Sequence, residues 1–179
     1  MKTICVFCSA NNVAGQYVEA AEEFARLIAE HGYDLVWGGS DRGLMKVMAD
    51  TVEKHGGRII GISMEMLKGS ERKLAYEMII AKDLSSRKAL LLKRSDALVL
   101  LVGGLGSLDE VTEMLELKKH DIHHKPIIVL NTNGFYDGLK QQLQRMKKEG
   151  FIRKELIDLI VFTDTPDEAI RLIDGSLPH

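Results

Sequence analysis

The sequence predicts a doubly wound α/β fold, in which one parallel sheet is covered by helices on both faces. Short apolar runs alternate with amphipathic helical patterns along the chain. The apolar runs are continuous, which is typical of strands buried on both faces. Alternation of strand and helix makes the strands parallel, because parallel neighbours need crossover connections. With 179 residues and no linker-like segment, we expect residues 1–179 to form a single domain.

The first elements follow this alternation. Residues 4–8 are expected to form a buried strand, and 17–31 a helix whose apolar residues recur at helical spacing. A second strand over 34–37 runs into two glycines. A second helix follows over 43–54 and stops at Gly56. The first two strands are thus each expected to be followed directly by a helix.

The middle of the chain is less regular. Residues 58–62 predict a third strand, but 64–75 are charged and poorly periodic, which favours a long loop or a short helix. A fourth strand is expected over 78–80. Asp83 is a suitable N-cap for a helix that runs to about Arg94.

The last third of the chain has the clearest strand, because residues 97–102 are all apolar. A glycine loop and a helix to about Lys119 follow. Thr165, Pro166 and Glu168 signal the start of the final helix, and the tail after Asp174 is expected to fray. The remaining expected elements are strands at 126–130 and 159–162 and a helix over 136–148.

The composition excludes several classes of protein. Lys plus Arg number 24 against 26 Asp plus Glu, which argues against an electrostatic nucleic-acid binder. No apolar run is long enough to span a membrane, and no cleavage site follows the apolar N-terminus. Two cysteines cannot form a disulfide framework. We therefore expect a cytoplasmic protein with no membrane or nucleic-acid partner.

Two glycine clusters follow expected strands, at 38–43 and 103–107. Ligands of open parallel sheets bind beyond the carboxyl ends of the strands, and exposed N–H groups at a helix start favour an anion. The second cluster is no dinucleotide fingerprint, because the third glycine position from Gly104 falls on Asp109. It is no Walker loop either, because no lysine follows Gly106. A phosphate is the simpler ligand; the alternative is that the glycines only form tight turns.

Charged residues near these clusters have two interpretations. Ser107 and Glu110 have the spacing of a capping box, so the carboxylate could only cap the helix. A carboxylate beside bound phosphate is costly, however, which suggests a further role for Asp109 or Glu110. Arg87 and Lys88 could clamp a phosphate or lie on a solvated helix face.

Other potentially reactive residues rank lower. Cys5 and Cys8 lie three positions apart in a strand, which sends them to opposite faces and favours a core role. His120, His123 and His124 lie in a polar segment before Pro126, so we expect a solvated loop and no metal.

Several motifs together resemble the "lonely guy" family of cytokinin-activating phosphoribohydrolases, formerly labelled lysine-decarboxylase-like. They are Phe7-Cys8-Ser9, Gly38-Gly39, Gly43-Leu44-Met45, Arg87-Lys88 and the run from Gly103 to Glu110, in the family's order and spacing over about residues 3–173. The resemblance implies a Rossmann-like homodimer without a cofactor. It also implies cleavage of the N-glycosidic bond of a nucleoside 5′-monophosphate, a cytokinin nucleotide or AMP, to free base and ribose 5-phosphate.

The resemblance assigns catalysis to Arg87 and Glu110 and phosphate binding to Gly104, Gly106 and Ser107. The full set of substrate-binding residues that it implies is Gly39, Ser40, Lys88, Gly103, Gly104, Leu105, Gly106, Ser107, Asp109 and Glu116.

This chain departs from the family's pattern at several positions. Leu84-Ser85 replaces Met-His, Asp41 adds an acid after the first glycine cluster, and Glu116 replaces a threonine. These changes keep open a second hypothesis, a nucleotide-binding protein with weak or no catalysis. A pyridoxal-phosphate lysine decarboxylase is a third, disfavoured because no separate cofactor domain is visible in the sequence.

Overall fold

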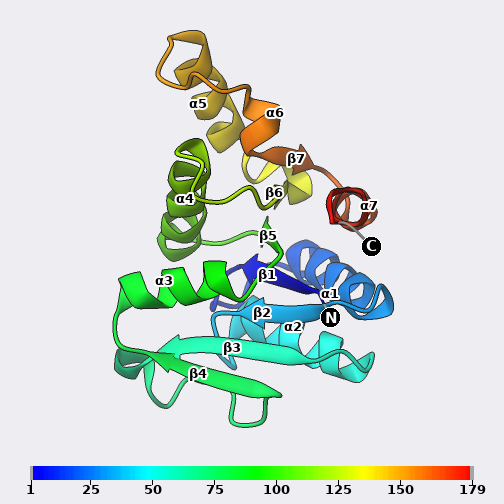
Figure 1. Ribbon diagram of the computed structural model, residues 1–179. Helices are drawn as coiled ribbons and strands as arrows, with labels where there is room; N and C mark the ends of the chain where they lie inside the picture. Colours follow the sequence, from blue (N-terminus) through cyan, green and yellow to red (C-terminus); the bar gives the residue numbers. More distant parts are fainter. Residues whose placement is uncertain (1, 178–179) are drawn as a thin grey trace.

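The computed structural model describes residues 2–177, which contain one sheet of seven parallel strands (Figure 1). The sheet order is β4-β3-β2-β1-β5-β6-β7, so the direction of winding reverses at β1. This confirms the doubly wound, Rossmann-like parallel fold. The strands are β1 (Thr3–Phe7), β2 (Asp34–Trp37), β3 (Ile59–Met64), β4 (Glu77–Ala81), β5 (Ala97–Leu100), β6 (Ile127–Leu130) and β7 (Val161–Thr163).

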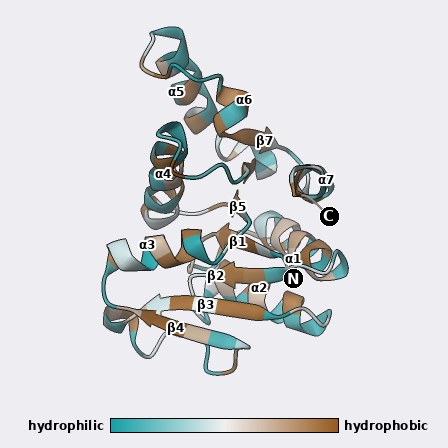
Figure 2. Cartoon of the chain, in the orientation of Figure 1, coloured by the Kyte–Doolittle hydropathy of each residue, from teal (hydrophilic) through white to brown (hydrophobic). Residues whose placement is uncertain are grey.

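Helices cover both faces of this sheet. Alternate residues of β1 show the two layers: Ile4 and Val6 pack with α1, α2 and α7, whereas Cys5 and Phe7 pack with α3 and α4. Cys8 belongs to the first layer, so the two free cysteines face opposite sides as predicted. The strands between the layers are predominantly apolar (Figure 2). The helices are α1 (Gly15–Glu30), α2 (Gly43–Lys54), α3 (Leu84–Lys93), α4 (Leu105–Lys119), α5 (Asp137–Lys148), α6 (Leu156–Leu159) and α7 (Pro166–Ser176).

Two of the predicted helix starts are confirmed in detail. Asp83 Oδ1 accepts a hydrogen bond from the Ser86 N–H at 2.7 Å, which fixes the first turn of α3. Thr165 Oγ1 accepts from the Glu168 N–H at 3.3 Å, with Pro166 as the first helical residue of α7. Arg87 and Lys88, two of the predicted site residues, follow the cap of α3 in its first turns.

Two predictions at the C-terminal end differ from the structure in their bounds. The strand expected over 159–162 begins only at Val161, because Leu156–Leu159 form the short helix α6, closed by a bond from the Ile160 N–H to the Leu156 carbonyl at 2.8 Å. A short apolar run is compatible with a strand or with a helix. Here Leu159 is the last residue of helix α6, and its side chain is buried. The tail does not fray after Asp174 either. Helix α7 continues to Ser176, and residues 178–179 lie outside the described range.

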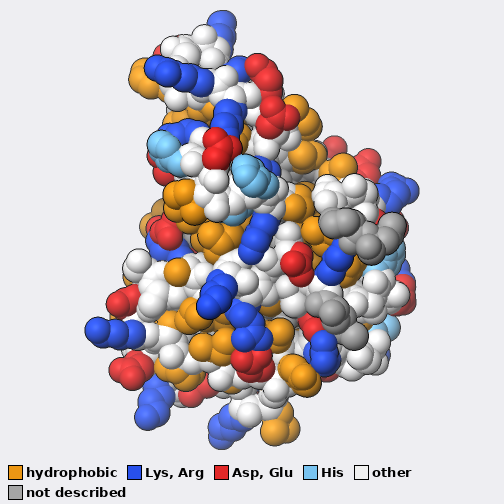
Figure 3. All heavy atoms as spheres, viewed as in Figure 1, with side chains coloured by type: hydrophobic (Ala, Val, Ile, Leu, Met, Phe, Trp, Pro, Cys, Tyr) orange, Lys and Arg blue, Asp and Glu red, His pale blue; other side chains and the backbone are white. Residues whose placement is uncertain are grey.

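The segment over 64–75 is largely a loop, as one of the two predictions had it. It starts with a 3₁₀ turn, η1 (Glu65–Leu67), and crosses the carboxyl edge of the sheet before β4. Among residues 2–177, no helix is both long and apolar enough to cross a membrane. On the face seen in Figure 3, basic and acidic side chains are interspersed, and neither sign gathers into one patch.

Candidate active site

The predicted site residues lie at the carboxyl edge of the sheet, on two neighbouring helices and two turns. Gly39 and Ser40 follow β2, and Gly103 and Gly104 lie between β5 and α4. Arg87 and Lys88 come from the first turns of α3, while Asp109 and Glu110 come from α4. Figure 1 shows α3 and α4 on the same side of the sheet.

The centre of the site is an ion pair between Arg87 and Glu110. Arg87 Nη1 donates to Glu110 Oε1 at 2.5 Å, and the two side chains are only 8% and 7% exposed. Arg87 Nε also donates to the Ile62 carbonyl in β3 at 2.8 Å. A buried ion pair costs desolvation energy for both groups, so its presence at a sheet edge indicates a role other than stability.

Gly38 makes room for the Arg87 guanidinium. A Cβ built at position 38 would lie 2.4 Å from Arg87 Nη2 and 2.9 Å from Met45 Cε. The next residue, Gly39, has a φ of +78°, which disfavours other residues there. The first glycine cluster therefore forms a tight turn, and it also makes room for Arg87, a role that neither interpretation of the cluster had given it.

The second glycine cluster opens the start of α4. Gly104 is the N-cap residue, and a Cβ at Gly104 or Gly106 would meet no protein atom within 4 Å. Gly103 differs, because its missing Cβ leaves room for Ser107, whose Oγ would lie 2.2 Å from it. Leu105 is 86% exposed. The first turn thus presents backbone N–H groups to open space, an arrangement that favours an anion.

The capping-box interpretation of Ser107 and Glu110 is wrong. With Gly104 as N-cap, Ser107 is the third helical residue, and α4 has no side-chain cap. Ser107 is buried against the Gly103 turn, and the Glu110 carboxylate bonds to Arg87 instead of a backbone N–H. Glu110 therefore does not cap helix α4.

Lys88 forms a second link between the two helices. Its Nζ lies 3.0 Å from an Asp109 carboxylate oxygen and 2.5 Å from one of Glu113, and its side chain is 11% exposed. The hydrogen bond to Glu113 raises the pKa of Lys88. Both cations that were considered as solvated face residues are thus buried and paired.

The environment of Glu110 shifts its titration toward higher pH. Burial raises the pKa of Glu110 above its ordinary value, and Arg87 opposes only part of that rise. Burial also raises the pKa of the Cys8 thiol, and the Glu110 carboxylate raises it further. A carboxyl group whose pKa is shifted by burial and by a charged partner is typical of a functional site.

Glu116 is not brought to this centre. It lies further along α4, where its carboxylate bonds to Lys119 and His120, and its side chain is 58% exposed. It lines a groove between α4 and α5 together with Leu139 and Phe151. Within a single chain, Glu116 does not lie beside Arg87 and Glu110, so its position does not support the predicted contact with substrate.

The histidine-rich loop differs from its prediction at His123. That residue is buried, and its Nε2 lies 2.9 Å from the Met114 carbonyl of α4. Burial lowers the pKa of His123. Among residues 2–177, no group of three or more His, Cys, Asp or Glu side chains is placed to hold a metal ion.

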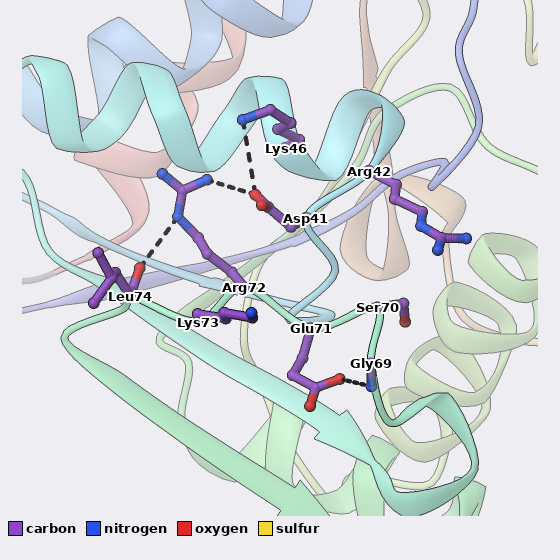
Figure 4. Close-up of a pocket in the computed structure, with 9 residues that line it drawn as sticks. All are labelled: Asp41, Arg42, Lys46, Gly69, Ser70, Glu71, Arg72, Lys73 and Leu74. Atoms are coloured by element: carbon purple, nitrogen blue, oxygen red, sulfur yellow. Dashed lines mark hydrogen bonds and ion pairs between the residues drawn. The ribbon is translucent and has the colours of Figure 1, made fainter.

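A polar pocket beside the first glycine turn has no counterpart in the sequence predictions (Figure 4). Arg72 Nη1 pairs with Asp41 at 2.8 Å and with Asp50 at 2.6 Å, and the Arg72 N–H donates to the Gly39 carbonyl at 2.8 Å. The loop after β3 is thereby fastened to the turn after β2. In the sequence, Asp41 stood out as an extra acid beside the first glycine cluster. Its pairing with Arg72 could not be predicted, because Arg72 lies 31 positions away.

Comparisons with known proteins show the family to which this chain belongs. Residues 45–173 match the family model described as "Possible lysine decarboxylase". A probable cytokinin riboside 5′-monophosphate phosphoribohydrolase of Arabidopsis thaliana is 34% identical over 181 residues, covering 99% of this chain and 90% of the relative. A second Arabidopsis cytokinin riboside 5′-monophosphate phosphoribohydrolase is 33% identical over 182 residues, covering 99% and 85%.

Solved structures support the fold. A molybdenum cofactor binding protein from Rippkaea orientalis has a TM-score of 0.76 and 22% identity, with 97% of this chain and 96% of that chain covered. The molybdenum cofactor carrier protein of Chlamydomonas reinhardtii has a TM-score of 0.74 and 22% identity, with the same coverage. At such identity the likeness concerns the fold alone.

Proposed function

Because the chain belongs to the lonely guy family of phosphoribohydrolases, we propose that it hydrolyses the N-glycosidic bond of a nucleoside 5′-monophosphate. The products are the free base and ribose 5-phosphate, and the substrate is a cytokinin nucleotide or AMP. The observation that carries the proposal is the buried Arg87–Glu110 pair on helices that flank the open, glycine-rich start of α4. We further propose that it works in the cytoplasm as a homodimer, without a metal or other cofactor.

The phosphate is assigned to the first turn of α4. Gly104 and Gly106 leave space in front of N–H groups that the helix cannot use, and the helix dipole adds partial positive charge. Binding the phosphate away from the reacting bond orients the ribose and helps to hold its C1′ near Glu110.

Glu110 is assigned the role of stabilising positive charge at the reacting centre. When the bond between C1′ and the base nitrogen breaks, positive charge develops on the ribose, and a nearby carboxylate stabilises it. Water then supplies a hydroxyl group to C1′ and a proton to the departing base. Arg87 occupies one oxygen of Glu110, and the other oxygen is assigned to the sugar or to the attacking water.

Arg87 has two assigned effects. It fixes the orientation of the Glu110 carboxylate through Nη1, while Nε is anchored on the Ile62 carbonyl. Its charge also balances negative charge on the phosphate or on the departing base. Loss of Arg87 is therefore expected to weaken nucleotide binding as well as turnover.

A panel of nucleoside monophosphates tests the proposal directly. Purified protein is incubated with each nucleotide and with the matching nucleoside, and the free base is quantified by chromatography. We expect release from at least one monophosphate and far slower release from its nucleoside. Equal turnover of adenosine and AMP would contradict the proposed binding of the 5′-phosphate. A thermal shift with AMP but no base release over hours would favour the alternative, a nucleotide-binding protein without activity.

A further inference from the structure

The charges around the catalytic pair do not by themselves favour an anionic substrate. Arg87 and Lys88 are the cations on the facing sides of α3 and α4, and both are paired there with Glu110, Asp109 and Glu113. With all three carboxyl groups ionised, this cluster carries one net negative charge. A phosphate monoester brings roughly two further negative charges near neutral pH. Another cation at the carboxyl edge of the sheet would offset this repulsion.

Arg42 is a cation at that edge whose guanidinium is unused. It is exposed and stands as the N-cap residue of α2, after the first glycine turn. Within residues 2–177 its guanidinium makes no hydrogen bond or ion pair. The neighbouring cations Lys46 and Arg72 both pair with Asp41, and Arg42 points away from that contact (Figure 4).

Backbone contacts connect the turn of Arg42 to the turn before α4. The Met45 N–H donates to the Ser9 carbonyl at 3.2 Å, and the Ser9 N–H donates to the Val102 carbonyl at 3.1 Å. Gly43 is packed so closely that a Cβ there would lie 2.3 Å from the Asn11 carbonyl oxygen. The turns after β2, β1 and β5 therefore form one continuous surface.

The distance across this surface suits an arginine. Strands β2 and β5 both pair with β1, so their ends lie two strand spacings, or roughly 10 Å, apart. An extended arginine side chain and a phosphate group together span that gap. A guanidinium also matches the geometry of phosphate oxygens better than an ammonium does.

We propose that Arg42 binds the 5′-phosphate of the substrate from the side of β2, opposite the N–H groups of α4. The inference rests on the proposed function, because it assigns a second contact to the same phosphate. It explains how the cluster accepts a dianion even when all three carboxyl groups are ionised. It also gives a role to a cation that the sequence analysis had not singled out.

Calorimetric titration with ribose 5-phosphate, AMP and adenosine tests this assignment at fixed ionic strength. Arg42→Ala should weaken binding of ribose 5-phosphate and AMP about tenfold or more, the scale of one charge-assisted hydrogen bond, and leave adenosine binding unchanged. Arg42→Lys should recover part of the loss. Lys73→Ala is the matched control, because Lys73 is also exposed and lines the same pocket; it should bind all three ligands like the parent.

The outcomes separate this inference from the proposed function. If the parent protein binds AMP and Arg42→Ala binds ribose 5-phosphate equally well, Arg42 has no part in phosphate binding. An equal loss of adenosine and AMP binding would also contradict the assignment, since it would indicate a general disturbance of the site. If the parent protein binds neither AMP nor ribose 5-phosphate, the proposed function falls together with the inference.

Discussion

Glu110 Oε1 accepts a hydrogen bond from Arg87 Nη1 at 2.5 Å, although the two residues lie 23 positions apart and belong to different helices. The contact rules out the capping-box interpretation of Glu110, which the sequence alone leaves open. It also places a buried carboxyl group where the open start of α4 can bring a phosphate nearby.

The pH dependence of turnover should report Glu110. Its pKa is raised above the ordinary 4.5 by burial. Because the ionised form of Glu110 is assigned the catalytic role, turnover should rise with pH through that raised pKa. The folded protein holds this proton more tightly than the unfolded chain does, so the contribution of Glu110 to stability should fall as pH rises through the same window. Rate profiles and denaturant unfolding of the parent and of Glu110→Gln measure both; a flat rate profile above pH 4.5 would contradict this assignment.

Gly38→Ala should disturb Arg87 without unfolding the protein. The added Cβ would lie 2.4 Å from Arg87 Nη2, so the end of that side chain has to move. Misplacement of a positioning group lowers turnover strongly, and we expect a loss of about tenfold or more. Gly175→Ala in α7 is the control, because a Cβ there meets no atom within 4 Å. An unchanged rate for Gly38→Ala would show that the guanidinium position is not critical.

Gly106→Ala should separate stability from binding. A Cβ at Gly106 meets no protein atom, and alanine favours a helix over glycine by up to about 1 kcal/mol, so the melting temperature should stay or rise. The same methyl group enters the space assigned to phosphate, so the Kd for AMP should increase. Thermal unfolding and calorimetry measure the two effects. An AMP affinity equal to that of the parent would contradict the location of the phosphate.

The sequence predicted the layered sheet well because its signals are local. Continuous apolar runs and the caps at Asp83 and Thr165 depend on neighbours within a few residues. The predictions that failed depend on distant partners or on ambiguous short patterns. The apolar run over 159–162 holds both the end of α6 and the start of β7, and the buried ring of His123 bonds to the Met114 carbonyl, nine positions away.

The site residues divide in the same way. The glycine clusters are visible in the sequence, but the support that Ile62 and Gly38 give to Arg87 is not. The contacts of Asp41 with Arg72 and of Lys88 with Glu113 join separate elements, and no spacing rule predicts them.

Helix α3 should lie at a subunit contact. Ala89 on this helix is exposed, Leu90 and Leu92 are only partly covered, and Leu84 is 51% exposed. An apolar surface of this kind favours association. We expect the parent protein to sediment as a dimer at micromolar concentration and Ala89→Glu to sediment as a monomer. Lys148→Glu on α5 serves as the control, and a monomeric parent protein would contradict the expectation.

The turnover of AMP by Glu110→Gln is the most direct test of the account. Glutamine keeps the size of the side chain and an oxygen that can accept from Arg87, but it removes the negative charge. We expect the variant to fold and to bind AMP, while base release falls by roughly 10²-fold or more, the scale of losing one well-placed electrostatic group. If the variant releases base at nearly the parent rate, Glu110 has no part in the chemistry, and the catalytic role proposed for the Arg87–Glu110 pair is wrong.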